Sequence, residues 1–270
     1  MKQKKKTKAD IITSVLYVIF GLIVAAALYG LGTLVYSLLG TTVGNMYYAD
    51  LAEDVRVDDS VDFAALAAKN SEIKAWIVLD DTAIDLPIVQ TTDNSYYLTH
   101  RFDEKKNKLG TPFIDKDNIG DFSDRHTVIY GHAVKSGAMF GSFWEYENPN
   151  YYKRNPEIKL YLADGTQYTL AVFSCARVDS VRSAIPLTFA SENAFLAYLD
   201  ELHELSAFDS SVSFDSGDRI VSFCVNVPDG SDDKLLLVSC KLVVGASETQ
   251  SADGTTETQT DASSGEDPAD

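Results

Sequence analysis

The chain of 270 residues is poor in cysteine and histidine. It has three cysteines and four histidines, and it contains neither a Cys-x-x-Cys nor a His-Glu-x-x-His motif. Zinc sites usually carry such spacings, so the sequence argues against zinc, and we expect no cofactor. The acidic run DKDNIGDFSD begins like a calcium loop. Ile119 occupies its fifth position, however, and His126 its twelfth, where an EF-hand needs a glutamate, so a solvated acidic loop is the better interpretation.

Basic residues are also scarce. The chain has 23 of them against 40 acidic residues, a net charge of −17, and five lysines stand in the first eight positions, MKQKKKTK. Nucleic-acid binding needs a surface patch of lysines and arginines, so we expect no nucleic-acid partner. The tail over 246–270 has no basic and no aromatic residue. Such a composition cannot bury enough apolar surface to fold, and it predicts a disordered acidic tail.

Charge is absent altogether from residues 11–40. About 20 apolar residues span a bilayer, so this segment is long enough to be a transmembrane signal-anchor. The lysines before it make residues 1–10 a cytoplasmic basic segment by the positive-inside rule. A cleaved signal peptide is the alternative, although its apolar region is normally only about 7–15 residues long. We therefore expect a single-pass protein of the cell membrane, with a cytoplasmic N-terminus and the domain after residue 40 outside the cell.

Residues 41–68 are interpreted as a stalk and an N-terminal helix, with Asp59 or Ser60 as N-cap. Between 69 and 245 the pattern changes to short β-like runs, which predict a mainly β domain, a single barrel or sandwich. The runs are AWIVL, DLPIVQ, HTVIYGH, IKLYLAD, QYTLAVFSCARV, RIVSFC and KLLLVSCKLV. One helix interrupts them, SENAFLAYLDELHEL, with Ser191 as its N-cap.

Two residues at strand ends have side chains that could take part in catalysis. Cys224 ends the run RIVSFC, and His132 ends HTVIYGH. A thiolate is the reactive form of cysteine, and a neighbouring imidazole activates it or supplies acid catalysis. A histidine beside a glycine is also an ordinary loop residue. Cys175 and Cys240 lie within strand runs as expected core residues, although an extracellular location would permit a disulfide between them.

An ordered set of segments resembles the class B sortases, membrane-anchored cysteine transpeptidases of Gram-positive bacteria. The set runs from Asn70 to Leu242 and comprises NSEIKAWIVLDDTAIDLPIVQ, DNSYYLTHRF, GTPFID and VIYGHAVKSGAMFGSF. The last of these resembles the family's catalytic-histidine segment, and the helix before the cysteine strand favours class B. The resemblance implies an eight-stranded sortase-type β-barrel with N-terminal helices.

The resemblance also implies a reaction. Cys224 would be the nucleophile and His132 the acid. The thiolate would attack a threonine carbonyl in a C-terminal sorting motif of a secreted protein and form a thioester. An amine of a peptidoglycan precursor or of a pilin would then accept the acyl group. Transfer to water, as in a cysteine peptidase, differs only in the acceptor.

Two departures from the family pattern stand out. In the first, the family usually reads Leu-Ser-Thr-Cys, and here Phe223 replaces the threonine. Strand alternation points Phe223 away from Cys224.

The second departure is a missing arginine. The family has an arginine at the start of the next strand, whereas this chain has no arginine after Arg219, and Leu235 aligns at that position. Lys234 could substitute through a β-bulge or be a solvated loop residue, and Arg177 is a further candidate. Without such a charge, the alternative function is a catalytically impaired pseudo-sortase that acts as a cell-surface binding or assembly module.

Further cleft residues are expected by resemblance, with packing as the alternative role for the two tyrosines. The recognition loop would fall near residues 183–188. The candidate substrate-binding residues are Ser222, Tyr130, Asn94, Tyr97, Ser183 and Thr188.

Overall fold

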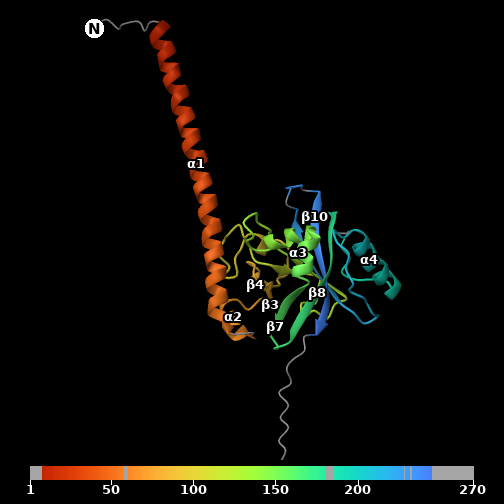
Figure 1. The fold of residues 1–270 in the computed structure, drawn as a ribbon. Coiled ribbons are helices and arrows are strands. Elements are labelled where there is room, and N and C mark those ends of the chain that lie inside the picture. The colour runs from red at the N-terminus through yellow and green to blue at the C-terminus, as the bar shows by residue number, and fades with distance from the viewer. Residues whose placement is uncertain (1–7, 58–59, 181–184, 228, 232, 245–270) are drawn as a thin grey trace, which may run out of the picture.

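A computed structural model describes residues 8–57, 60–180, 185–227, 229–231 and 233–244 (Figure 1). The predicted tail over 246–270, most of the basic segment 1–10 and Ser183 lie outside the described residues. The helices are α1 (Lys8–Val55), α2 (Phe63–Lys69), α3 (Pro149–Arg154) and α4 (Glu192–Glu204), with the 3-10 turns η1 (Tyr96–Leu98) and η2 (Gly141–Glu147).

Eight strands close into a barrel in the order β10-β8-β7-β3-β4-β5-β6-β9, and β9 pairs with β10 to complete it. The barrel is mixed, because β4–β5 and β6–β9 pair in parallel and the other neighbours are antiparallel. The predicted eight-stranded barrel is therefore confirmed. Its strands are β3 (Ile73–Val78), β4 (Asp85–Val89), β5 (Phe113–Ile114), β6 (His126–Tyr130), β7 (Glu157–Leu162), β8 (Gln167–Asp179), β9 (Ile220–Asn226) and β10 (Lys234–Val244); a separate short ladder joins β1 (Arg56–Val57) to β2 (Ser60–Val61).

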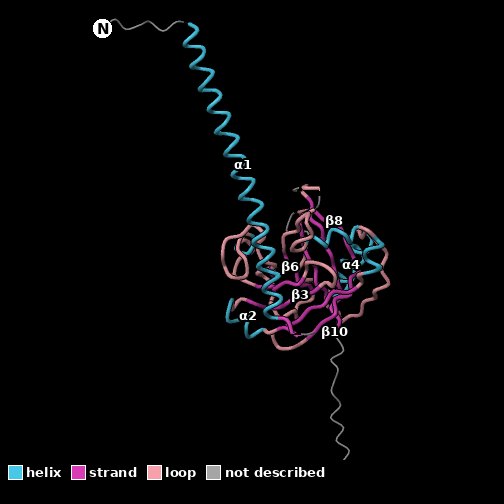
Figure 2. The backbone as a smooth tube through the Cα atoms, turned by 60° about the vertical axis from the view of Figure 1, so that its left-hand side comes forward, coloured by secondary structure: helices cyan, strands magenta, loops and turns pink. Residues whose placement is uncertain are grey.

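The N-terminal part differs from the expected stalk. Helix α1 continues without a break to Val55 and lies along the barrel beside α2 and β4 (Figures 1 and 2). Tyr48, Leu51 and Val55 are buried at a helical spacing and dock this end onto the core. The N-cap of α2 is also different from the prediction: Asp62, not Asp59 or Ser60, accepts a hydrogen bond from the Ala65 N–H.

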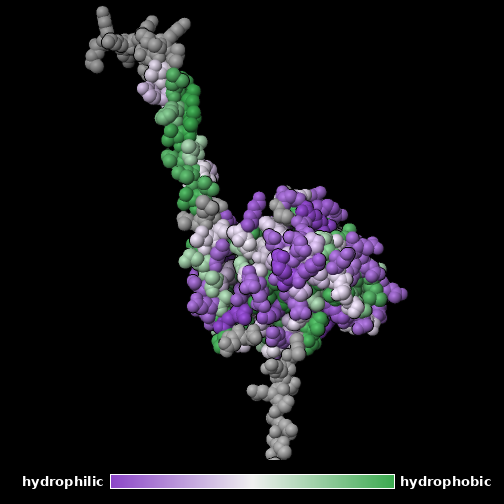
Figure 3. All heavy atoms as spheres, viewed as in Figure 1, coloured by the Kyte–Doolittle hydropathy of each residue, from purple (hydrophilic) through white to green (hydrophobic). Residues whose placement is uncertain are grey.

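The first half of α1 stands clear of the body. Its side chains from Thr13 to Val35 are exposed, and they form an apolar column in Figure 3. Among the described residues this is the one helix long and apolar enough to cross a membrane, by length and composition alone.

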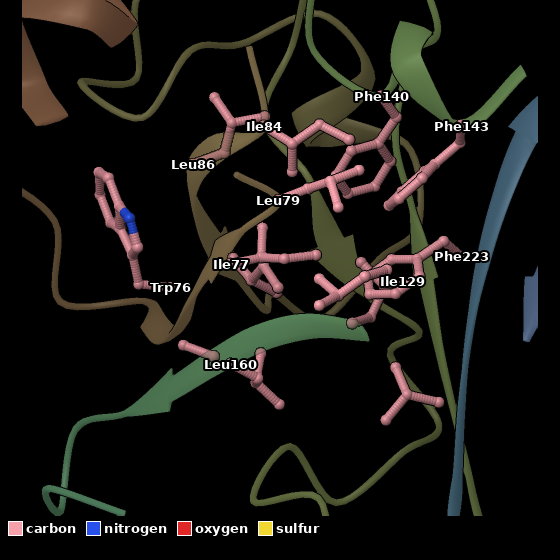
Figure 4. Packing of buried hydrophobic residues seen from close by; sticks show 14 of the residues in the cluster. Trp76, Ile77, Leu79, Ile84, Leu86, Ile129, Phe140, Phe143, Leu160 and Phe223 are labelled. Atoms are coloured by element: carbon pink, nitrogen blue, oxygen red, sulfur yellow. The ribbon is translucent and has the colours of Figure 1, made fainter. Parts of the chain in front are cut away.

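Alternating residues of β9 face two different cores. Val221, Phe223 and Val225 point into the barrel. The Phe223 ring lies 4.8 Å from that of Phe143 and 5.5 Å from that of Phe140 (Figure 4). This confirms the prediction that Phe223 points away from Cys224, which belongs to a second, outer cluster covered by α4. Ser191 caps α4 as predicted, since its hydroxyl accepts from the Ala194 N–H.

Candidate active site

The site forms where two parallel neighbours, β6 and β9, end side by side. Tyr130 is the register partner of Cys224, and the Gly131 N–H donates to the Cys224 carbonyl at 3.3 Å. His132 follows directly. The parallel pairing thus brings the two predicted catalytic residues, 92 positions apart in the sequence, to one end of the barrel.

His132 is held by a backbone carbonyl. Its Nε2 lies 2.8 Å from the oxygen of Leu98, at the end of η1. A carbonyl oxygen only accepts, so Nε2 carries the proton of this bond. Among the described residues Nδ1 has no hydrogen-bond partner, and it is the nitrogen left to exchange a proton with a substrate or a thiol.

Cys224 is only 3% exposed in this structure. Burial raises the pKa of its thiol to about 12, because the charged thiolate loses its hydration. The resting sulfur is therefore a protonated thiol at neutral pH. All three cysteines are buried and free, so Cys175 and Cys240 form no disulfide.

An apolar pocket opens beside these residues. Its volume is about 220 Å³. It lies between the 94–98 segment, the end of β6 and the start of β10, next to both the His132–Leu98 bond and the Tyr130–Cys224 pair. A larger cavity of about 460 Å³ lies between α1 and residues 82–86 and 136–139, but no neighbour of Cys224 lines it. The smaller pocket is lined by Asn94, Leu98, Phe113, Tyr130, Ser180, Ile185 and Leu235.

The predicted cleft residues separate into two groups. Asn94 and Tyr130 line the pocket, and both bind one oxygen of Asp115, at 3.0 Å each. Tyr97 does not reach it: it is buried, and its hydroxyl bonds to Asn70 and Glu72. Its role here is packing.

Ser222 and Thr188 are also not part of the pocket lining. Thr188 is exposed on the loop before α4. Ser222 is fully buried and lies in a polar chain that sequence analysis missed: His126 Nε2 and Ser239 Oγ each lie 2.8 Å from its hydroxyl oxygen. His126 Nδ1 lies 2.6 Å from the Pro186 carbonyl. These hydrogen bonds connect the cysteine strand β9 to the loop before α4.

The structure does not bring Lys234 to Cys224. Leu237 is the register partner of Cys224, and no bulge interrupts β10 between Lys234 and Leu237. Three positions separate these two residues, so alternation places Lys234 on the opposite face. Its ammonium pairs with Asp179.

The two arginines considered from the sequence, Arg177 and Arg219, bind other groups. Arg177 binds Glu147 and Asp229, each at 2.6 Å. Arg219 donates to the Phe122 carbonyl near the far end of β9. Leu235, aligned with the family arginine, lies on the same face as Leu237 and lines the pocket.

Comparison with known proteins agrees with the resemblance. No family model matches the chain. Over 153 residues it is 31% identical to sortase B of Listeria monocytogenes, covering 57% of this chain and 62% of that protein. Over 160 residues it is 28% identical to sortase B of Staphylococcus aureus, covering 59% and 65%. The chain thus spans a little under two thirds of the length of these curated relatives.

Solved structures extend the likeness over more of the chain. Sortase B from Bacillus anthracis matches with a TM-score of 0.65 and 28% identity, covering 74% of this chain and 95% of that one. Sortase B of Clostridium perfringens matches with a TM-score of 0.63 and 28% identity, covering 67% and 99%. The closed mixed barrel, with a cysteine strand beside a histidine strand, is that of a sortase. Within that class, the sequence relatives and the structural neighbours reported above are sortase B proteins, and this chain is similar to them in sequence and in fold.

Proposed function

We propose that the protein is a cysteine transpeptidase that uses Cys224 as nucleophile and His132 as its proton-transfer partner. The observation that carries this proposal is the pairing of their two strands. The Gly131 N–H bonds to the Cys224 carbonyl, and His132 is the next residue. The adjoining apolar pocket can receive a substrate side chain.

The chemistry follows from the protonation states. The resting thiol gives its proton to His132 Nδ1 as Sγ attacks a substrate carbonyl carbon. The tetrahedral intermediate collapses when the carbon–nitrogen bond breaks, and the imidazolium returns the proton to the departing amine. A thioester on Cys224 remains. An acceptor amine then attacks it, forms a new amide and releases the thiol.

The substrates we propose are secreted proteins with a C-terminal sorting signal, and the acceptor is an amine of a peptidoglycan precursor or a pilin. Solved sortase B structures include a substrate complex from Staphylococcus aureus and a complex with triglycine, a peptide that carries a free amino terminus. Helix α1 would anchor the enzyme in the cell membrane with its N-terminus in the cytoplasm, supported by the exposed apolar column.

The test is an acyl adduct on the protein. The full chain in detergent is incubated with a pool of sorting-signal peptides and examined by intact-protein mass spectrometry. An adduct is expected in the wild type and in Lys234→Ala, because Lys234 pairs with Asp179 on the other face. Cys224→Ala should form none, and His132→Ala should form it much more slowly. An adduct that persists in Cys224→Ala would contradict the assignment.

The pseudo-sortase alternative is supported by the buried thiol with its raised pKa and by Leu235 in the place of the family arginine. The same experiment separates the two functions. A folded protein with three free thiols that forms no adduct with any peptide would favour the non-catalytic module.

A further inference from the structure

Acyl transfer to a thiol creates a negative oxygen in the tetrahedral intermediate. Enzymes stabilise this oxyanion with fixed hydrogen-bond donors. Strand β9 has a neighbour on each side, so the ladders engage most of its backbone N–H groups. A side chain on the face of Cys224 is therefore a suitable source of a donor.

Most side chains on that face cannot do so. Leu235 and Leu237 are apolar. The Ser222 hydroxyl is fully buried in the chain with His126, and the Tyr130 hydroxyl bonds to Asp115.

Asn226 meets the requirement. It lies two residues after Cys224 on the same strand, so the two side chains share a face. It is exposed, and it is the direct register partner of Leu235.

Two hydrogen bonds fix Asn226. Its Oδ1 accepts from the Ala133 N–H at 3.1 Å, and its backbone carbonyl accepts from Trp144 Nε1 at 2.7 Å. The first bond defines which end of the amide is oxygen. It leaves the Nδ2 group without a hydrogen-bond partner among the described residues, and it ties this side chain to the residue that follows His132.

We propose that Asn226 is a further catalytic residue, whose Nδ2–H donates to the oxyanion formed over Cys224. This rests on the proposed transpeptidase function. A cross-strand pair has its Cβ atoms about 4.5–5.5 Å apart, so the donor lies across the ladder from Leu235, on β9 instead of β10. The amide is neutral, so it stabilises the oxyanion by a hydrogen bond and not by a full positive charge.

Two variants distinguish a donor from a structural role. Asn226→Asp keeps an oxygen to accept from Ala133 but lacks the donor, and Asn226→Ala lacks both. The full chain in detergent is mixed with the pool of sorting-signal peptides, and the rate of thioester formation is followed by quenched mass spectrometry. Both variants should form the thioester about 10²–10³-fold more slowly than wild type. Methyl methanethiosulfonate, a neutral reagent whose reaction forms no oxyanion, should modify Cys224 at the wild-type rate in both.

A rescue variant provides a second measurement. In the Asn226→Ala background, Leu235→Arg places a guanidinium beside the same position and should raise the acylation rate at least tenfold.

Several results would overturn the proposal. One is that Asn226→Asp or Asn226→Ala forms the thioester at the wild-type rate. Another is that both variants lose reactivity towards methyl methanethiosulfonate in parallel with acylation. A third is that Leu235→Arg does not raise the acylation rate of Asn226→Ala. Wild-type protein that forms no thioester would refute the proposed function itself, and the inference with it. If the wild-type protein forms the thioester and Asn226→Ala forms it equally fast, only the inference about Asn226 is refuted.

Discussion

Acidification should destabilise the protein through His126. This histidine is fully buried, and burial lowers its pKa from 6.5 to about 4. Its ring bridges the Pro186 carbonyl and the Ser222 hydroxyl. The carbonyl only accepts, so the neutral ring donates from Nδ1 and accepts the Ser222 hydroxyl proton at Nε2. A second proton would place a positive charge in a fully buried site beneath α4, and the Ser222 hydroxyl would have to turn from donor to acceptor.

The magnitude follows from linkage. The unfolded chain takes up the proton near pH 6.5, whereas the folded chain resists it until about pH 4. Folding stability from the neutral ring is therefore fully present above pH 6.5 and is lost as the pH falls towards 4. At about 1.4 kcal/mol for each pKa unit, the loss is about 3 kcal/mol.

The assay is urea unfolding of the full chain in detergent, followed by tryptophan fluorescence, at intervals from pH 7.5 to pH 4. Many carboxylates titrate in the same range, so the relevant quantity is the difference between wild type and His126→Gln. The variant should be less stable at pH 7.5, and the difference should shrink by about 3 kcal/mol by pH 4. A difference that stays constant across this range would refute the argument that His126 is buried in its neutral form.

Further predictions concern the cysteine strand and its neighbours. Alkylation of Cys224 by a neutral reagent should accelerate about tenfold per pH unit up to at least pH 10, because its pKa is about 12; a plateau near pH 7 would show a thiolate already formed. Phe223→Ala should lower the free energy of unfolding by about 3–5 kcal/mol, measured by denaturant, because the ring is fully buried against Phe140 and Phe143; a loss under 1 kcal/mol would contradict this packing. Lys234→Ala should leave acylation within about twofold of wild type, since an exposed ion pair such as that with Asp179 contributes little; a hundredfold loss would restore Lys234 as a catalytic candidate.

Local patterns predicted much of the fold. The short apolar runs located most of the barrel strands, the cap at Ser191 marked the start of α4, and strand alternation placed Phe223 in the core. The continuation of α1 was missed because its second half lacks the uninterrupted apolar character of the first. The spacing of Tyr48, Leu51 and Val55 was the available signal.

The site was harder to predict, because its contacts join distant segments. Cys224 and His132 were predicted from their positions at strand ends and from the family resemblance, and the structure places them at the same end of the barrel. The bond from His132 to Leu98 and the buried Ser222–His126 contact depend on register between elements, which a single sequence does not encode locally. The proposed role of Asn226 could have been raised from the sequence, because a residue two positions after Cys224 on a strand shares its face.

The central claim is that Cys224 forms a thioester with the carbonyl of a sorting-signal peptide. The direct measurement is the intact mass of the full chain after incubation with the peptide pool, followed by addition of an acceptor amine such as triglycine. The account predicts an acyl adduct on wild type that is absent in Cys224→Ala and that the amine discharges as a new peptide. A folded wild-type protein with a free Cys224 and no adduct at any peptide concentration would contradict it.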